Sequence, residues 1–379
     1  MPTINGLSHR LKDRIKQLSP TLLRLVGLKL LDKTQTEALL RPFQLSYSVK
    51  MPVLLAGVVD VADSKKVLFE PKAAEADPDF VWSYPNTNSR SQLLRSGNLT
   101  VGNSFLDTDF GNRALLADLF NPDRRMVERY PVTIALWSHY WGTYYDFVFF
   151  VAAKLARIKM VMSPAQFAEA AVAYPLFHTP FEAELLQLLG VKPDRLFDTR
   201  QYALHFDRCI LANNSSWFYP AAADVLALKA IVEAELKPAR SSPVRRIYIS
   251  RKGRRKITNE EALIVMLRQY DFEVIEDKPR SVIEQIELYR SASFVIGPHG
   301  ASFANLLWCR PGTQLFEFFA PNYRPEYFRY LAHVLDLRYA GYCFGPAEES
   351  HHSFVDADIE VSVDEVERGL VRVLTNQAS

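Results

Sequence analysis

Residues Phe294–Trp308 read FVIGPHGASFANLLW and decide the fold of the second half of the chain. Three apolar residues, Phe294–Ile296, are typical of the end of a buried strand. The turn Gly297–Gly300 breaks regular structure, and Ala301–Trp308 has the pattern of a short helix. A strand that passes through glycine into a helix start directs unpaired backbone N–H groups at one point, which favours an anion such as phosphate. The alternative is an ordinary turn with a hydrogen-bonded His299, and these residues alone leave both open.

The composition is that of a globular protein with the length of two domains. Its 379 residues exceed what one hydrophobic core usually holds, and 48% of them are hydrophobic and 23% charged. The formal net charge of +2 is too small to indicate nucleic acid as the main partner. The three cysteines lie far apart and form neither a metal-ligand spacing nor a disulfide framework. We therefore expect a cytoplasmic protein without a bound metal.

A basic amphipathic segment, Leu7–Leu31, precedes the first predicted strands. Its arginines and lysines stand among leucines at helical spacing, interrupted at Pro20. Such a segment can rest on an anionic membrane surface, which would make the protein peripheral at the inner membrane. The alternative, which we favour, is that it packs on its own domain with a solvated basic face; the sequence leaves both open. No apolar run reaches the roughly 20 residues that span a bilayer, and no signal peptide is recognisable.

The segment Lys237–Val244, KPARSSPV, is the best linker because it combines prolines, serines and charge without apolar periodicity. It divides the chain into an N-terminal domain, residues 1–236, and a C-terminal domain, residues 237–379. Beyond the linker, strands alternate with helices, which predicts a parallel, Rossmann-like sheet. The predicted strands are Arg246–Ser250, Phe272–Ile275, Phe294–Ile296 and Gln314–Phe318, and the predicted helices are Glu260–Tyr270, Val282–Ser291 and Ala301–Trp308.

Three loops fall at the carboxyl ends of these strands, where such sheets bind ligands. The loop Arg251–Lys256 is cationic, Gly297–Gly300 is rich in backbone amides, and the segment after Glu317 offers a carboxylate. Together they suit a diphosphate joined to a hydroxyl-bearing sugar, that is, a nucleotide sugar. The alternative for the basic loop is a solvated surface, the usual fate of a charge run. Asn259 is predicted to cap the helix that follows this loop.

Asp146, in the N-terminal half, is a candidate general base. It falls in the first turn of a predicted helix beside Tyr144 and Tyr145, which are candidates for binding an acceptor. A general base needs to reach the proton of a hydroxyl group, but a carboxylate at a helix start is also stabilised by the helix dipole alone. His139 lies seven residues earlier, and Gly142 argues against a helix that would place both on one face.

The two stretches Arg245–Ile275 and Ser281–Phe319 resemble the C-terminal half of the family-61 glycosyltransferases. That family includes bacterial capsule and lipopolysaccharide enzymes, plant xylan-decorating transferases and protein O-GlcNAc transferases of the eukaryotic secretory pathway. The shared residues, in matching order and spacing, are Ser250, Arg251, Arg255, Asn259, Glu260, Glu284, Gln285, Gly297, His299, Gly300, Ala301, Asn305, Pro311, Gly312 and Glu317.

The resemblance implies a GT-B fold, an α/β architecture in which two Rossmann-like domains face each other across a cleft. It also implies inversion at the anomeric carbon without an obligatory metal, with the donor held by the C-terminal domain. Arg251 and the turn His299–Ala301 are then expected to bind the diphosphate, and Asn259 and Glu260 to brace the basic loop. Glu317 is expected either to reach ribose or sugar hydroxyls or to fix the strand end. The full donor-binding set is Ser250, Arg251, Lys252, Arg255, Asn259, Glu260, Gly297, His299, Gly300, Ala301, Ser302, Asn305 and Glu317.

The N-terminal half resembles the family in a shorter stretch. Bacterial members carry a G-N-Y-Y-H-F-like segment followed by an acidic residue, and residues Gly142–Phe147 stand in that frame. Asp146 takes the place of the usual histidine, and Phe150 takes that of the acid. We therefore expect Asp146 to accept the proton of the acceptor hydroxyl, with His139 as the second candidate.

These inferences predict an inverting glycosyltransferase of bacterial surface-polysaccharide biosynthesis. The donor is expected to be a UDP-linked sugar, the acceptor a hydroxyl of a glycan or glycolipid, and no other cofactor is expected. Two alternatives stay open: a non-catalytic nucleotide-sugar-binding protein of polysaccharide assembly, and an epimerase or sugar phosphorylase on the same fold. A dinucleotide-binding dehydrogenase is disfavoured because no GxGxxG follows a predicted strand.

Overall fold

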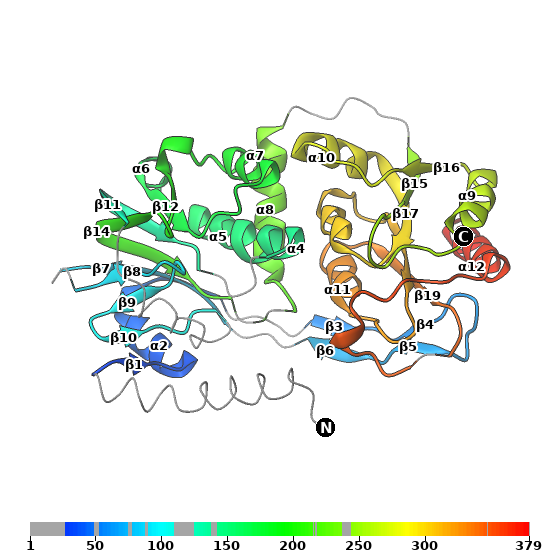
Figure 1. Ribbon diagram of the computed structural model, residues 1–379, viewed down its shortest axis with the longest axis horizontal. Helices are drawn as coiled ribbons and strands as arrows, with labels where there is room; N and C mark the ends of the chain where they lie inside the picture. The colour runs from blue at the N-terminus through cyan, green and yellow to red at the C-terminus, as the bar shows by residue number, and fades with distance from the viewer. Residues whose placement is uncertain are drawn as a thin grey trace, which may run out of the picture. The chain divides into compact units, whose positions relative to one another are not determined.

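The computed structural model describes residues 27–48, 53–74, 78–87, 90–109, 125–137, 142–214, 216, 218–236, 244–346 and 348–378 (Figure 1). The chain forms two compact units. Unit 1 comprises Met1–Lys50 and Ala76–Val232, and unit 2 comprises Met51–Glu75 and Glu233–Ser379. Most of the basic segment Leu7–Leu31 lies outside the described residues. In the part of the chain that is described, no helix combines the length and the apolar character that crossing a bilayer requires.

Unit 2 is built on a five-stranded parallel sheet with the order β16-β15-β17-β18-β19. β16, the second strand of this sheet in chain order, lies at one edge beside β15, the first, and β17, β18 and β19 follow on the other side of β15, an order found in doubly wound sheets. The predicted α/β class is confirmed. The strands are β15 (Arg245–Ile249), β16 (Phe272–Ile275), β17 (Ala292–Pro298), β18 (Gln314–Phe319) and β19 (Arg338–Cys343), and the helices are α9 (Glu260–Gln269), α10 (Val282–Ser291), η5 (Ala301–Trp308), α11 (Tyr327–Val334), η6 (His352–Phe354) and α12 (Val363–Ala378).

The strands of this sheet are apolar because both faces are covered. Phe294 and Ile296 of β17 pack in a core with Phe316 and Phe318 of β18, under α9 and α12, which lie side by side (Figure 1). The intervening Val295 is also fully buried. The unit also contains two small antiparallel sheets of two strands each: β3 (Val53–Leu55) pairs with β6 (Lys72–Ala74), and β4 (Val58–Val59) pairs with β5 (Val67–Phe69).

Unit 1 contains a six-stranded mixed sheet with the order β13-β12-β11-β14-β7-β2. The first four strands in this order are parallel, and β7 and β2 continue the sheet in antiparallel pairs. These strands are β2 (Gln44–Ser48), β7 (Asp79–Pro85), β11 (Met126–Ala135), β12 (Ala171–Tyr174), β13 (Leu196–Asp198) and β14 (Tyr202–Ala212). A smaller sheet joins β1 (Lys29–Leu30), β10 (Ser104–Phe105), β9 (Leu99–Val101) and β8 (Gln92–Leu93). The helices are α2 (Lys33–Leu40), η1 (Arg41–Phe43), α6 (Pro164–Glu169), α7 (Pro180–Leu188), η4 (Pro193–Arg195) and α8 (Ala222–Glu235), besides those described next.

A π-helix interrupts the helical segment that follows β11. The segment begins as α4 (Tyr144–Asp146), capped by the side chain of Thr143, continues as a π-helix, η3 (Phe147–Ala152), and ends as α5 (Ala153–Val161). All six side chains of the π-helix are buried. Such single turns occur often at functional sites.

A buried ion pair holds this helix in unit 1. The side chains of Lys154 and Asp109 are fully buried, and Lys154 Nζ lies 2.6 Å from Asp109 Oδ2. Lys154 also donates to the carbonyl of Trp137, and Asp109 accepts the N–H of Asn214 at 2.7 Å. Burial raises the pKa of Asp109 to about 7 and lowers the pKa of Lys154. Each charge therefore depends on its partner to remain in the interior.

Candidate functional site

The glycine turn after β17 presents backbone donors at the carboxyl edge of the sheet. The N–H of His299 donates to the carbonyl of Phe318 at 2.9 Å, and the first helical bond runs from Phe303 N to Gly300 O at 3.0 Å. The N–H groups of Gly300, Ala301 and Ser302 therefore precede the first helical hydrogen bond, as at any helix start. The predicted helix Ala301–Trp308 exists, but it is a 3₁₀-helix rather than an α-helix.

Arg251, which follows β15, lies directly against this turn. Its Nη1 is 3.4 Å from the carbonyl oxygen of His299, and its Nε donates to the carbonyl of Arg254 at 2.8 Å. A Cβ on Gly300 would overlap Nη1 of Arg251 and lie 2.8 Å from its Cζ. The backbone of Gly300 is extended, with φ at 178°, so glycine is required here for space and not for conformation. The sequence-predicted neighbours Arg251 and His299 are thus brought together.

Arg255 is a second cation at the same edge. It is 5% exposed, adopts a left-handed φ of 58°, and lies over the ring of Tyr323 at 5.6 Å. Its buried Nε has no hydrogen-bond partner among the described residues. Burial, followed by the charges of neighbouring arginines, lowers the pKa of Arg251 to about 10; burial also lowers that of Arg255. An anion at this position would relieve both effects.

The rest of the basic loop is held by acidic side chains. Arg254 pairs with Asp356 at 3.0 Å, and the N–H groups of Lys252 and Lys256 donate to Asp277 and Asp358. In the part of the chain described here, Arg251 and Arg255 have no such carboxylate partner. The loop is therefore only partly the solvated surface that a charge run usually forms, and it leaves two guanidinium groups available for an anion.

His299 and Glu317 form a buried polar pair behind the turn. His299 Nδ1 lies 2.6 Å from Glu317 Oε1, and the Tyr339 hydroxyl donates to Glu317 Oε2 at 2.7 Å. Burial, then Arg255 and Arg251, lower the pKa of His299, so the imidazole is neutral; burial raises the pKa of Glu317. Both carboxylate oxygens are engaged within the protein and Glu317 is fully buried. Of the two roles expected for Glu317, this geometry favours fixing the strand end.

Several residues of the predicted donor-binding set make contacts within unit 2. Asn305 is 3% exposed and donates to Gln285 Oε1 at 2.6 Å and to the carbonyl of Ser302 at 3.1 Å. A Cβ on Gly297 would lie 2.9 Å from the carbonyl oxygen of Ile249, so this glycine allows close packing of the strands. The N–H of Ser250 donates to the carbonyl of Ile275 at 3.0 Å. These contacts shape the turn and its support.

The predicted helix cap by Asn259 is wrong. Asn259 occupies the N-cap position of α9, but its side chain makes no capping bond. Its amide instead donates to the carbonyl of Val361 at 2.7 Å and accepts the N–H of Val361 at 3.3 Å. Glu260 accepts the hydroxyl of Tyr248 at 2.7 Å. Both residues therefore fasten α9 next to the basic loop, Asn259 to the segment before α12 and Glu260 to β15.

In unit 1, the structure places Asp146 at a partly exposed helix start. Its Oδ2 accepts the hydroxyl of Thr143 at 2.9 Å, and burial raises its pKa to about 6. Tyr144 is half-buried, with its ring 5.0 Å from that of Phe181. Tyr145 is buried and donates to the carbonyl of Phe218 at 3.2 Å. His139 lies outside the described residues.

A polar cluster at His178, Asp198 and Arg200 was missed by the sequence reasoning. His178 follows β12 and Arg200 follows β13, and both contact Asp198. The two strands read AVAY and LFD and are too short to show a strand period. A usable signal was the run of charged residues Asp194–Arg200 around a short apolar stretch.

Comparison with known proteins gives the class. The sequence model of the family Glycosyltransferase 61 matches residues 109–316, more than half of the chain, and the chain belongs to this family. The match includes Asp146, Arg251 and His299, and ends one residue before Glu317.

A plant enzyme is among the relatives. Over 121 residues the chain is 30% identical to the xylan glycosyltransferase MUCI21 of Arabidopsis thaliana, a match that covers 30% of this chain and 24% of that protein. The chain therefore aligns with about a quarter of the length of this relative. Within the described residues, no three His, Cys, Asp or Glu side chains gather as metal ligands would.

Proposed function

We propose that the protein transfers a sugar from a nucleotide diphosphate sugar, expected to be UDP-linked, to a hydroxyl of a glycan or glycolipid. The observation that carries this proposal is the packing of Arg251 against Gly300, beside Arg255 and the N–H groups of the turn. The buried Arg255 and the half-buried Arg251, neither with a carboxylate partner among the described residues, and several backbone donors suit two adjacent phosphoryl groups. Family membership supplies the reaction class.

The proposed chemistry is a single displacement with inversion. The acceptor oxygen attacks the anomeric carbon from the face opposite the diphosphate, the bond from that carbon to the phosphate oxygen breaks, and Asp146 takes the hydroxyl proton. Arg251, Arg255 and the turn stabilise the charge that develops on the leaving diphosphate; loss of one such contact typically costs about 3–4 kcal/mol of the barrier. The proposal does not include an obligatory metal. It includes the GT-B arrangement, with the donor on unit 2 and the acceptor on unit 1.

Nucleotide binding tests the donor half. We would measure the melting temperature of the full chain with UDP and with sets of UDP-, GDP- and CMP-sugars, for the wild type, Arg251→Ala and Arg254→Ala. Arg254→Ala is the matched control because this arginine is half exposed and already paired with Asp356. The wild type and the control should be stabilised by one nucleotide class, and Arg251→Ala should lose most of that stabilisation. Equal stabilisation of all three proteins would refute the donor site.

Assays of turnover test the proposed transfer reaction and the alternative functions. Asp146 stands where bacterial members of the family usually have histidine, and Phe150, where they have an acid, is fully buried. This departure favours, as a second candidate, a non-catalytic nucleotide-sugar-binding protein. Slow hydrolysis of the donor with clean inversion, followed by NMR spectroscopy, would exclude that candidate. An epimerase would change the sugar without any acceptor.

The most specific part of the proposal concerns the acceptor class and where in the cell the transfer takes place. We propose a glycan or glycolipid of surface-polysaccharide assembly, at the cytoplasmic side of a bacterial membrane. The name of the plant relative makes xylan fragments a second acceptor class to test. Transfer to one class and not the other, measured by release of the nucleoside diphosphate, would decide between them.

A further inference from the structure

Three neighbouring strands of unit 1 end beside candidate ligand-binding side chains. β11, β12 and β13 are adjacent and parallel, so their carboxyl ends lie at one edge of the sheet. His178 follows β12, Arg200 follows β13, and Tyr144 comes after β11. Ligands of open parallel sheets bind beyond this edge. The cluster therefore lies where a substrate of unit 1 would be expected.

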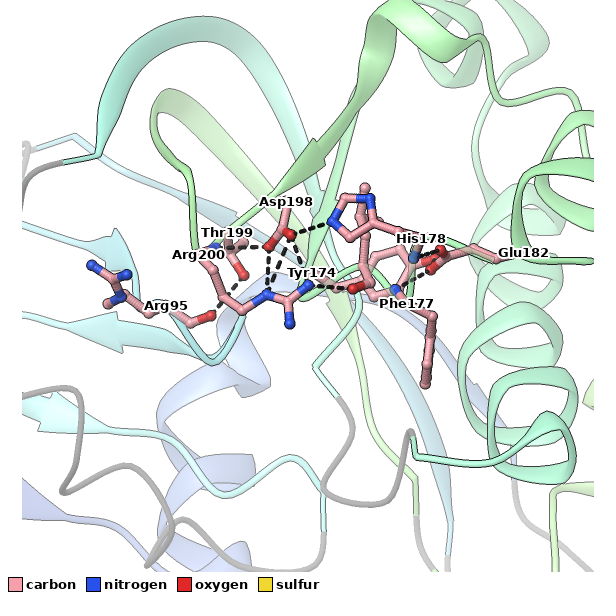
Figure 2. Close-up of polar contacts among 9 residues, drawn as sticks. Arg95, Tyr174, Phe177, His178, Glu182, Asp198, Thr199 and Arg200 are labelled. Atoms are coloured by element: carbon pink, nitrogen blue, oxygen red, sulfur yellow. Dashed lines mark hydrogen bonds and ion pairs between the residues drawn. The ribbon is translucent and has the colours of Figure 1, made fainter. Parts of the chain in front are cut away.

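Asp198 holds both of the other polar side chains of the cluster (Figure 2). Its Oδ2 lies 2.8 Å from His178 Nε2 and 2.8 Å from Arg200 Nη2, and its Oδ1 accepts the backbone N–H and Nε of Arg200 at 2.9 and 3.0 Å. Asp198 is 3% exposed. Burial alone would raise its pKa, but hydrogen bonds from Arg200 and His178 outweigh burial and lower the pKa. Asp198 is therefore a carboxylate at neutral pH.

The backbone that carries His178 is fixed independently. His178 has a left-handed φ of 57°, a conformation that a non-glycine residue adopts at some cost. The buried carboxylate of Glu182 accepts the N–H groups of Phe177 and His178 at 3.0 and 2.8 Å and the hydroxyl of Tyr174 at 2.6 Å (Figure 2). The side chain of His178 is nevertheless 55% exposed. An imidazole is thus held in one orientation at the surface.

The cluster leaves one acceptor and one donor open to a ligand. Because Asp198 accepts from Nε2, Nδ1 is the ring nitrogen left to a ligand, and in the neutral form of an imidazole such a nitrogen is an acceptor. Arg200 Nη1 is a donor, and neither atom has a partner among the described residues. His178 Nε2 and Arg200 Nη2 share one oxygen of Asp198, so the imidazole and the guanidinium that carry the two open atoms lie on either side of this carboxylate. Two adjacent sugar hydroxyls offer the complementary pair, one O–H to donate and one oxygen to accept.

Two aromatic rings, one near each of these strand ends, support this reading. Phe181 is the second residue of α7, shortly after His178, and its ring lies 5.0 Å from that of Tyr144 in α4, edge to face. Both rings are partly exposed. Sugar rings pack on aromatic surfaces through their apolar faces, while planar polar groups bind their hydroxyls. An anion would bind here less favourably than a neutral sugar, because Asp198 neutralises the charge of Arg200.

We propose that His178, Asp198 and Arg200 form a subsite of unit 1 for adjacent hydroxyl groups of the glycan acceptor. This inference rests on the proposed function, because it assigns the acceptor side of the same reaction. Asp198 and Glu182 are positioning residues, and His178 and Arg200 make the contacts. Asp146 remains the proposed base.

The test separates acceptor binding from donor binding. We would compare the wild type with His178→Asn and Arg200→Ala; asparagine tolerates a left-handed φ, so the loop can keep its conformation. His205→Asn is the matched control, because His205 is an exposed histidine of the same unit, on β14. Each full-length protein would be applied to an array of xylan fragments and bacterial surface-polysaccharide fragments, and its melting-temperature shift with UDP-sugar would be measured in parallel.

Each outcome has a distinct meaning. The wild type and His205→Asn should bind the same glycans, and loss of one contact in His178→Asn or Arg200→Ala should weaken binding about tenfold or more. The nucleotide-induced shift should be unchanged in all four proteins. Unchanged glycan binding by His178→Asn and Arg200→Ala would overturn the subsite, as would a wild type that binds nucleotide sugar but no glycan on the array. A wild type that is not stabilised by any nucleotide sugar would instead count against the proposed function.

Discussion

Replacing Gly300 by alanine tests the close approach on which the proposed donor site depends. The added Cβ would overlap Nη1 of Arg251 and lie 2.8 Å from its Cζ, closer than real Cβ contacts. The extended φ of 178° accommodates alanine without strain. The arginine side chain is flexible and must therefore move, while the strand and the 3₁₀-helix keep their positions. The substitution should thus remove the proposed contact of Arg251 with the donor without changing the charge of the protein.

The expected loss follows from one charge-assisted contact. A hydrogen bond to a charged group contributes about 1.5–3 kcal/mol, which corresponds to a rise in Kd of about 10- to 100-fold. At a ligand concentration 100 times its Kd, the wild type gains about 2.7 kcal/mol in free energy of unfolding. A variant that binds 100-fold more weakly gains only about 0.4 kcal/mol at the same concentration.

Thermal unfolding with and without UDP-sugar measures this difference. Arg251→Ala and the double variant complete a mutant cycle, in which the double variant should bind no more weakly than Arg251→Ala alone. Gly142→Ala is the control, because a Cβ there would meet nothing within 4 Å. If Gly300→Ala folds normally and keeps the full ligand-induced shift, Arg251 does not bind the donor from this position and the reasoning fails.

Three further predictions concern other parts of the chain. Asp146→Asn should lower kcat by about 10²–10⁴-fold. Because burial raises the pKa of Asp146 to about 6, the rate of the wild-type enzyme should fall as the pH drops below that value. A pH profile of the variant should lack this decline. Lys154→Met should lower the free energy of unfolding by about 3–5 kcal/mol in urea titrations, because Asp109 is left alone in the interior, and Asp109→Asn added to it should recover part of the loss. Arg255→Asn removes the guanidinium but keeps a residue type that tolerates the left-handed φ. The Kd for the nucleotide sugar should therefore rise about tenfold in a binding titration. Tyr323→Phe, which keeps the ring beneath Arg255, should change this Kd little.

The parallel sheet of unit 2 could be predicted because local sequence determines it. The strands at Phe294–Ile296 and Gln314–Phe318 are short apolar runs between turns, and both are confirmed within β17 and β18. Because the carboxyl ends of parallel strands lie at one edge of the sheet, the sequence alone predicted that Arg251 and Gly300 would meet there.

Contacts between distant residues could not be predicted in the same way. Asn259 has the residue type of a helix cap, but Val361, 102 residues later, engages its amide. Glu317 has the residue type of a ligand for hydroxyl groups, but Tyr339 and His299 occupy both of its oxygens. His178 follows β12 and Asp198 ends β13, two very short strands that are brought together only by pairing between segments about 25 residues apart.

The length of the π-helix Phe147–Ala152 sets the angular offset between the two ends of its helical segment. One residue more or less in a helix turns everything beyond it by about 100°. The start of the segment presents Asp146 at a partly exposed position, and its continuation carries Lys154 into the interior opposite Asp109. A chain shorter by one residue here would rotate the amine away from its carboxylate and the buried side chains of α5 away from the core. The number of residues in this segment is therefore a property that the fold constrains.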